Sequence, residues 1–168
     1  MRYVSKRTRR FRGFTLIEAA LTTAIISFGV MGMLQLLATG TVSNANGTDM
    51  TMGLNLARNI RELMVGLPNA DPTTPTHWGA ETGETLATYD DLDDFNDKSF
   101  SPPIDARRQS LANYSGWTQS VRVQNVDNNL LTSVVPNGSS PALRVTVTIT
   151  HNGKYVCDLS WVQFDALP

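Results

Sequence analysis

The hydrophobic and polar positions divide the chain into an apolar N-terminal segment, a helical stripe and a strand-rich C-terminal third. Residues 19–38 form a 20-residue apolar stretch in which Gln35 is the only strongly polar side chain. As an α-helix this stretch would extend about 30 Å, the thickness of the hydrocarbon layer of a membrane. It lies within a longer segment, residues 19–48, that contains no ionisable residue. The pattern predicts a membrane-spanning helix near the N-terminus.

A second helical pattern follows the charge-free segment. Apolar residues recur there at intervals of three and four, as expected for one face of a helix: Leu56, Ala57, Ile60, Leu63, Met64 and Leu67. Arg58, Arg61 and Glu62 fall on the other face, and Gly66 and Pro68 form a stop signal. We expect the helix to reach Gly66 and to pack its apolar stripe on the globular part of the chain.

The middle of this long helix carries several residues that disfavour helix. They are Gly40, Asn44, Asn46, Gly47 and Gly53, and each glycine costs up to about 1 kcal/mol relative to alanine. The sequence therefore predicts bending or local melting around residues 40–47.

The last third alternates apolar and polar residues with the period of a β-strand. Residues 117–126 alternate in part and residues 143–150 alternate cleanly, and Asn152-Gly153 then gives the signal of a tight hairpin. Residues 155–161 would return as the partner strand, but a two-residue turn would place Asp158 and Ser160 beside apolar positions. A bulge or a longer loop would resolve this conflict, and both stay open.

Residues 130–135 read as a further short strand within a loop region. Together with the long helix, the pattern predicts an α+β fold with a small antiparallel sheet of three to four strands.

Charge changes this picture because it is unevenly distributed. The 168 residues include 14 basic and 15 acidic side chains, and six of the basic ones, but no acidic one, lie in residues 1–13. The rest of the chain therefore carries a net charge of −7. A basic head before an apolar helix predicts a cytoplasmic N-terminus and an exported C-terminal part. The near balance overall argues against a nucleic-acid-binding protein, which usually has a basic excess.

The densest charge lies in residues 88–97, within a loop-rich region punctuated by prolines. The segment contains five aspartates: Asp90, Asp91, Asp93, Asp94 and Asp97. Tyr89, Leu92 and Phe95 recur every three residues, which predicts a short amphipathic turn with the aspartates facing solvent. The alternative is a Ca²⁺ site, because Ca²⁺ prefers hard oxygen ligands, although the spacing does not match an EF-hand loop.

Candidate catalytic chemistry is sparse. His77 and His151 are the two histidines and are far apart in the sequence, and the chain contains no phosphate-binding or metalloprotease motif. Cys157 is the single cysteine, which excludes a disulfide scaffold, and we expect it to be a small buried strand residue. The sequence predicts no enzyme and no cofactor.

Glu18 is unusual because a carboxylate at the edge of an apolar helix is costly and usually has a partner. It lies in the string Gly13-Phe14-Thr15-Leu16-Ile17-Glu18, between the basic head and the apolar run. This arrangement resembles the N-terminal signal of type IV pilins and of the pseudopilins of type II secretion. The alternative is that Glu18 has no specific partner and is a surface carboxylate that reaches back to the membrane interface.

The resemblance implies a role for each residue of the motif. A prepilin peptidase would cut between Gly13 and Phe14, and Phe14 would become the N-methylated first residue. Glu18 would pair with the Phe14 amine of its own or a neighbouring subunit, since opposite charges attract strongly in a medium of low dielectric constant. The family also has a long N-terminal helix packed on a small sheet, and many members have a C-terminal disulfide that a lone Cys157 cannot form.

The domain organisation implied in this way has four parts. Residues 1–13 are a leader that is removed, residues 14–40 span the membrane or lie in a filament core, residues 41–66 continue the helix, and residues 67–168 form the exported domain. The protein would be a minor pilin or pseudopilin that stays in the inner membrane with its N-terminus inside until it joins a periplasmic or cell-surface filament. Its partners would be prepilin peptidase, other subunits, the assembly platform and membrane lipid, and no nucleic acid.

Two other functions stay open from the sequence. One is a membrane-anchored exported domain that binds a ligand and never polymerises. The other is an exported soluble enzyme released by cleavage near Thr41, since a secretory signal or, given Arg9-Arg10, a twin-arginine signal would also begin with a basic head.

Overall fold

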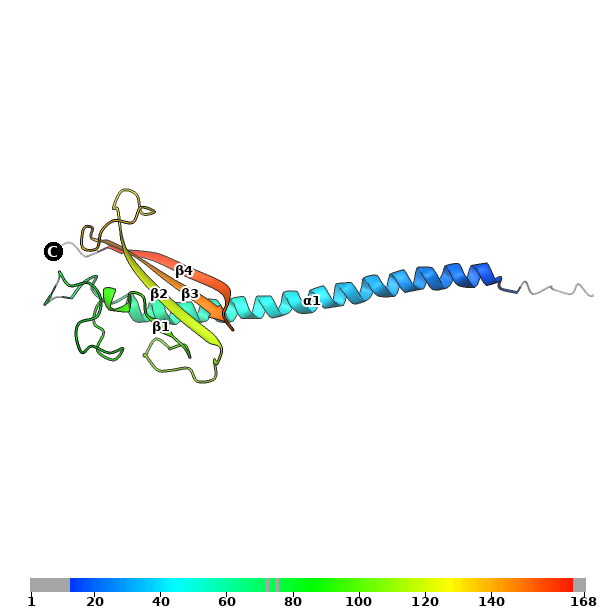
Figure 1. The fold of residues 1–168 in the computed structure, drawn as a ribbon, viewed down its shortest axis with the longest axis horizontal. Helices are drawn as coiled ribbons and strands as arrows, with labels where there is room; N and C mark the ends of the chain where they lie inside the picture. The colour runs from blue at the N-terminus through cyan, green and yellow to red at the C-terminus, as the bar shows by residue number, and fades with distance from the viewer. Residues whose placement is uncertain (1–12, 72, 75, 165–168) are drawn as a thin grey trace, which may run out of the picture. The chain divides into compact units, whose positions relative to one another are not determined.

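The structure is a computed structural model that describes residues 13–71, 73, 74 and 76–164. The basic residues of the predicted leader and the last four residues lie outside this part of the chain. Two compact units are present, Met1–Ala45 and Asn46–Pro168. The elements in chain order are the helix α1 (Leu16–Met64), the short 3₁₀ helix η1 (Asp93–Phe95), and the strands β1 (Ser99–Phe100), β2 (Trp117–Val126), β3 (Ala142–His151) and β4 (Lys154–Phe164) (Figure 1).

Among its described residues, the first unit contains residues 13–15 and α1 as far as Ala45. The predicted melting around residues 40–47 is wrong, because α1 is α-helical throughout this stretch. No proline interrupts it, and the threonine hydroxyls of this stretch donate to carbonyl oxygens four residues earlier, which leaves the helical backbone intact. Thr41 Oγ1 lies 2.7 Å from Leu37 O and Thr51 Oγ1 lies 2.9 Å from Gly47 O.

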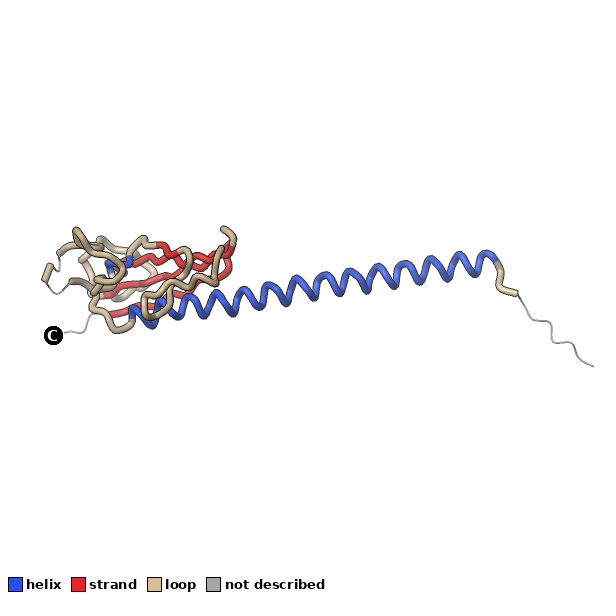
Figure 2. The backbone as a smooth tube through the Cα atoms, turned by 90° about the horizontal axis from the view of Figure 1, so that it is seen from below, coloured by secondary structure: helices blue, strands red, loops and turns tan. Residues whose placement is uncertain are grey.

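The second unit packs the last turns of α1 on an antiparallel sheet. The strands lie in the order β1-β2-β3-β4, each beside its neighbour in sequence, and Figure 2 shows the sheet against this part of the helix. The architecture is α+β with four antiparallel strands, within the predicted three to four. Alternation predicted β2, β3 and β4, whereas β1 lies in a region that we expected to be loop. The helix ends at Met64, two residues before the expected Gly66.

The predicted apolar stripe forms the helical side of the core. Leu56, Ala57, Ile60 and Met64 are buried, Leu63 and Leu67 are partly buried, and Arg58, Arg61 and Glu62 are exposed. The stripe meets the alternate residues of the sheet that point inward, among them Val121, Val123, Val145, Val147 and Ile149. Buried Gln119 fastens the two layers, because its amide donates to Leu56 O at 2.9 Å and accepts from Ile104 N at 2.7 Å.

The β3–β4 hairpin resolves the conflict at Asp158 and Ser160 by a bulge. The register shifts between Ile149 and Thr150, so that Tyr155 pairs with Thr150 and Cys157 pairs with Ile149. The extra residue places Asp158 opposite Thr148 on the polar face of the sheet. Cys157 is buried, as predicted.

Residues 130–135 do not form the short strand that their composition suggested. They form turns closed by Ser133 N–H donating to Leu130 O at 2.8 Å, and a single bridge joins Val134 to Val126. Asp127 explains the turn, because its carboxylate accepts from the backbone N–H groups of Asn129 and Leu130.

Candidate functional site

The N-terminal motif lies at the beginning of α1. Thr15 is the residue before the helix, and its hydroxyl accepts a hydrogen bond from Glu18 N–H at 3.3 Å. The same hydroxyl lies 3.5 Å from Glu18 Oε2. The sequence matches the Thr-x-x-Glu pattern of a helix N-terminus: the Thr15 hydroxyl accepts from a free N–H group and donates to the Glu18 carboxylate. The sequence carried this signal, and our sequence analysis missed it.

The helix that follows is exposed on every side. All residues from Gly13 to Thr48 are exposed, including the apolar ones. Phe14 and Ile17 are each 70% exposed, and Phe28 and Leu36 are 77% and 79% exposed. Among the described helices α1 is long and apolar enough to cross a membrane, and none of its most apolar stretch is buried. An isolated helix of this kind leaves a large apolar surface in need of a non-aqueous environment.

Most side chains at the centre of the aspartate-rich segment, residues 88–97, are buried rather than exposed to solvent. Tyr89, Leu92 and Phe95 are buried, as their spacing predicts. The prediction that all the aspartates face solvent is wrong, since Asp91, Asp93 and Asp94 are at most 2% exposed. Asp90 and Asp97 are exposed as expected.

Backbone hydrogen bonds explain why these carboxylates are buried. Asp94 Oδ2 accepts from Asp90 N–H at 2.9 Å and from Asp91 N–H at 3.4 Å, while Asp94 N–H donates to Asp91 Oδ1 at 3.1 Å. The side chains thus close the turn that leads into η1. Burial raises the pKa of Asp91 to about 8 and raises the pKa of Asp93 and Asp94, and the Asp91 carboxylate raises that of Asp94 further.

Two glutamates that the sequence analysis did not single out lie beside this segment. Glu81 and Glu84 begin and end a β-turn, in which Glu84 N–H donates to Glu81 O at 3.1 Å and Gly83 has a φ of +98°. One oxygen from each of Glu81, Glu84 and Asp94 lies within 4.8 Å of the other two, and Asp90, Asp91 and Asp94 form a second such group. Only folding brings residues 81–84 to Asp94, so the spacing in the sequence did not reveal the first group.

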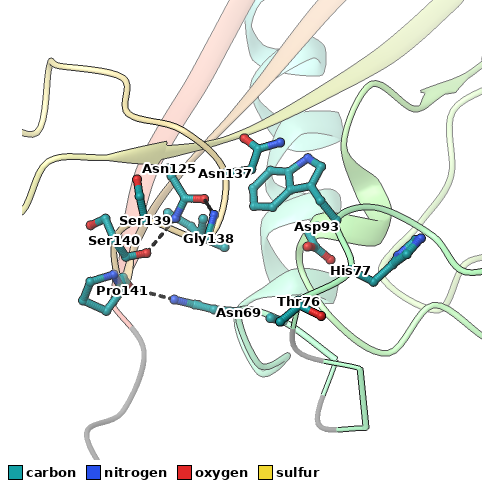
Figure 3. A pocket seen from close by; sticks show the side chains of 13 residues that line it. Asn69, Thr76, His77, Asp93, Asn125, Asn137, Gly138, Ser139, Ser140 and Pro141 are labelled. Atoms are coloured by element: carbon teal, nitrogen blue, oxygen red, sulfur yellow. Dashed lines mark hydrogen bonds between the residues drawn. The ribbon is translucent and has the colours of Figure 1, made fainter.

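An open pocket of about 550 Å³ lies between the loop after α1 and the loop before β3. Figure 3 shows how hydrogen bonds hold its rim, with Asn69 donating to Pro141 O at 2.8 Å and Asn125 donating to Ser140 O at 2.7 Å. Asn69 Oδ1 and Asp93 Oδ2 are buried in the wall without a hydrogen-bond partner. The pocket is thus lined mainly by polar side chains from these two loops.

The two histidines, His77 and His151, contact different residues. His77 Nδ1 is 3.4 Å from Glu81 Oε1, whereas His151 stacks on Trp117 and places Nδ1 3.2 Å from Asp49 Oδ2. The His151 contacts link the hairpin to α1 within the second unit, which gives this histidine a structural role.

No protein-family model, no characterised protein and no solved structure matches the chain. Its function is therefore argued from its own residues.

Proposed function

We propose that the chain is a structural subunit, a minor pilin or pseudopilin, of a type IV pilus or of a type II secretion filament. Prepilin peptidase cleaves it between Gly13 and Phe14, and it assembles through its N-terminal helix. The observation that carries the proposal is the uncovered apolar surface of α1, a helix that starts within the Gly13–Glu18 motif.

The apolar surface suits two successive environments. In the membrane, lipid tails cover a helix whose charge-free segment is 30 residues long, from residue 19 to residue 48. In a filament, the same surface packs against the helices of neighbouring subunits. A soluble protein would not leave so many large apolar side chains in water.

Glu18 has two roles under this proposal, and they depend on different properties of the side chain. Its Oε2 accepts from the Thr15 hydroxyl that caps the helix, and the amide oxygen of glutamine can accept in the same way. Its negative charge pairs with the Phe14 amine that cleavage creates, preferably in an adjacent subunit, and this role requires a carboxylate. The pair fixes the axial position of one subunit against the next.

The two roles of Glu18 can be separated by substitution. Glu18→Gln keeps the cap and removes the charge, so we expect normal membrane insertion and at least a tenfold loss from the sheared or cross-linked filament fraction of the native cell. The matched control, Thr15→Ala, weakens the cap by about 1 kcal/mol and keeps the charge, so we expect near-normal incorporation. Normal incorporation of Glu18→Gln would contradict the pairing role.

The second candidate function is a membrane-anchored exported domain that binds a ligand and does not polymerise. The open pocket of about 550 Å³ with its mainly polar lining is the observation that favours it. The same fractionation separates the two candidates, because such a protein would be found in membranes only and would not cross-link to other subunits through α1.

A further inference from the structure

Glu81, Glu84 and Asp94 of the second unit each have one carboxylate oxygen that accepts hydrogen bonds from the protein. Glu81 Oε1 accepts from the Thr74 hydroxyl at 2.9 Å and lies near His77. Glu84 Oε2 accepts from Glu81 N–H at 3.0 Å. Asp94 Oδ2 accepts from the backbone at Asp90 and Asp91. The side chains are therefore held by protein donors before any ligand binds.

For Asp94 and Glu81, the opposite oxygen accepts from no N–H group or hydroxyl of the protein, and the Glu84 carboxyl is hydrogen-bonded to both of these side chains. Asp94 is fully buried, and its Oδ1 has no hydrogen-bond partner. Glu81 Oε2 is likewise buried without a partner. A buried acceptor in this state costs about 1–3 kcal/mol, and more if it is charged. Two such oxygens in one group of converging carboxylates indicate that a bound species completes their coordination.

The basic side chains of this region are engaged elsewhere. Arg108 donates to the carbonyl oxygens of Leu86, Ala87 and Tyr89, and the Lys98 ammonium lies over the Tyr89 ring, 5.5 Å from its centre. Within the described ranges, His77 is the one basic residue that forms an ion pair with any of the three carboxylates. The negative charge of the group is thus not balanced by lysine or arginine.

We propose that Glu81, Glu84 and Asp94 bind one Ca²⁺ ion, with Asp94 Oδ1 and Glu81 Oε2 among the ligands. Opposite ligands of Ca²⁺ are about 5 Å apart, which accommodates oxygens that lie within 4.8 Å of one another. Mg²⁺ is the weaker candidate, because it usually keeps several waters and binds through one or two carboxylates, whereas Ca²⁺ takes six to eight oxygen ligands. Water and backbone carbonyls supply the remaining positions.

The neighbouring group of Asp90, Asp91 and Asp94 is less suitable for the ion. Asp91 Oδ1 and Asp94 Oδ2 already accept backbone hydrogen bonds, and Asp90 is exposed. Neither group depends on filament assembly, so failure of the filament proposal would leave the calcium site standing.

Calcium titration of the full chain in detergent, after removal of metal with EGTA, tests the proposal. We expect calorimetry to show one site with a Kd on the order of 10⁻⁴ M, typical of exported modules, and saturating CaCl₂ to raise Tm by several degrees. Glu81→Gln and Glu84→Gln should each weaken binding about tenfold or more. Their Tm in EGTA should equal or exceed that of the unchanged chain, because each removes a like charge, which shows that they still fold.

Two matched controls make the outcome specific. Asp97→Asn changes an exposed aspartate of the same segment, tolerates its φ of +56°, and should bind Ca²⁺ normally, as should Asp90→Asn. The proposal is overturned by the absence of calcium binding or by an equal Tm increase with NaCl of the same ionic strength. Loss of binding in Asp90→Asn but not in Glu84→Gln would also overturn it.

Discussion

Cys157 illustrates how a residue's surroundings set its chemistry. It is 3% exposed and lies in β4 with its sulfur toward α1. Burial raises the pKa of its thiol, and the negative charge of Asp158 raises it further. A raised pKa means less thiolate at neutral pH, and the thiolate is the nucleophile. Cys157 is therefore a packing residue of low reactivity.

We expect Cys157 to react slowly with the thiol reagent DTNB. At pH 8 the folded chain in detergent should react at least about tenfold more slowly than the chain unfolded in guanidinium chloride, because unfolding both exposes the thiol and restores its ordinary pKa. Absorbance at the wavelength of the released thiolate measures both rates. Equal rates would show that Cys157 is accessible and that its burial does not control its reactivity.

At the residue scale the sequence predicted apolar positions better than polar ones. The burial of Tyr89, Leu92 and Phe95 followed from their spacing. The burial of Asp91 and Asp94 did not, because it depends on backbone N–H groups that only this turn presents to them. Glu81 and Glu84 were missed for a related reason, since their proximity to Asp94 is created by tertiary folding.

α1 packs closely on the β3–β4 hairpin at Gly53, and this close packing explains why a glycine occupies the position. A Cβ atom at Gly53 would lie 2.8 Å from Cys157 Sγ and 3.0 Å from Val156 Cγ1. The helix packs this closely because the bulge places Val156 and Cys157 against it. In the sequence Gly53 only weakened the helical pattern, because the strand that requires it lies about 100 residues away.

We expect Gly53→Ala to lower the free energy of unfolding by about 1–3 kcal/mol through overpacking, even though alanine favours helix by up to about 1 kcal/mol. Adding Cys157→Ala should recover at least about 0.5 kcal/mol relative to the sum of the single changes, because it removes the opposing sulfur. Urea unfolding followed by tryptophan fluorescence measures these energies.

Gly47→Ala is the matched control for the close contact. Gly47 lies in the same helix, where an added Cβ meets nothing within 4 Å, so alanine should stabilise the chain slightly. If Gly53→Ala stabilised the chain as Gly47→Ala does, the close packing of α1 on β4 would be contradicted.

At the element scale, the type of each long element was predictable and the details at its ends were not. Alternation identified β2, β3 and β4, and the conflict at Asp158 indicated a bulge without locating it. The unbroken helix through residues 40–47 was not predicted, because the propensities of single residues are weak and the surrounding helix overrides them.

The distribution of charge characterises the whole molecule. The six basic residues of positions 1–13 balance much of an acidic remainder, and their removal would leave a chain of net charge −7. Within that remainder, charge is absent from residues 19–48, which are exposed, and apart from Glu18 it is concentrated in the second unit. Such a chain has one part suited to lipid or other helices and another suited to water.

Cleavage between Gly13 and Phe14 is the central claim, because the pairing of Glu18 and the retention of α1 both depend on it. Intact mass spectrometry of the chain purified from the membranes of its native cell tests it directly. We predict a mature protein of residues 14–168 that begins at N-methylated Phe14. A protein that still begins at Met1, or one that begins near Thr41 without the apolar helix, would contradict this account.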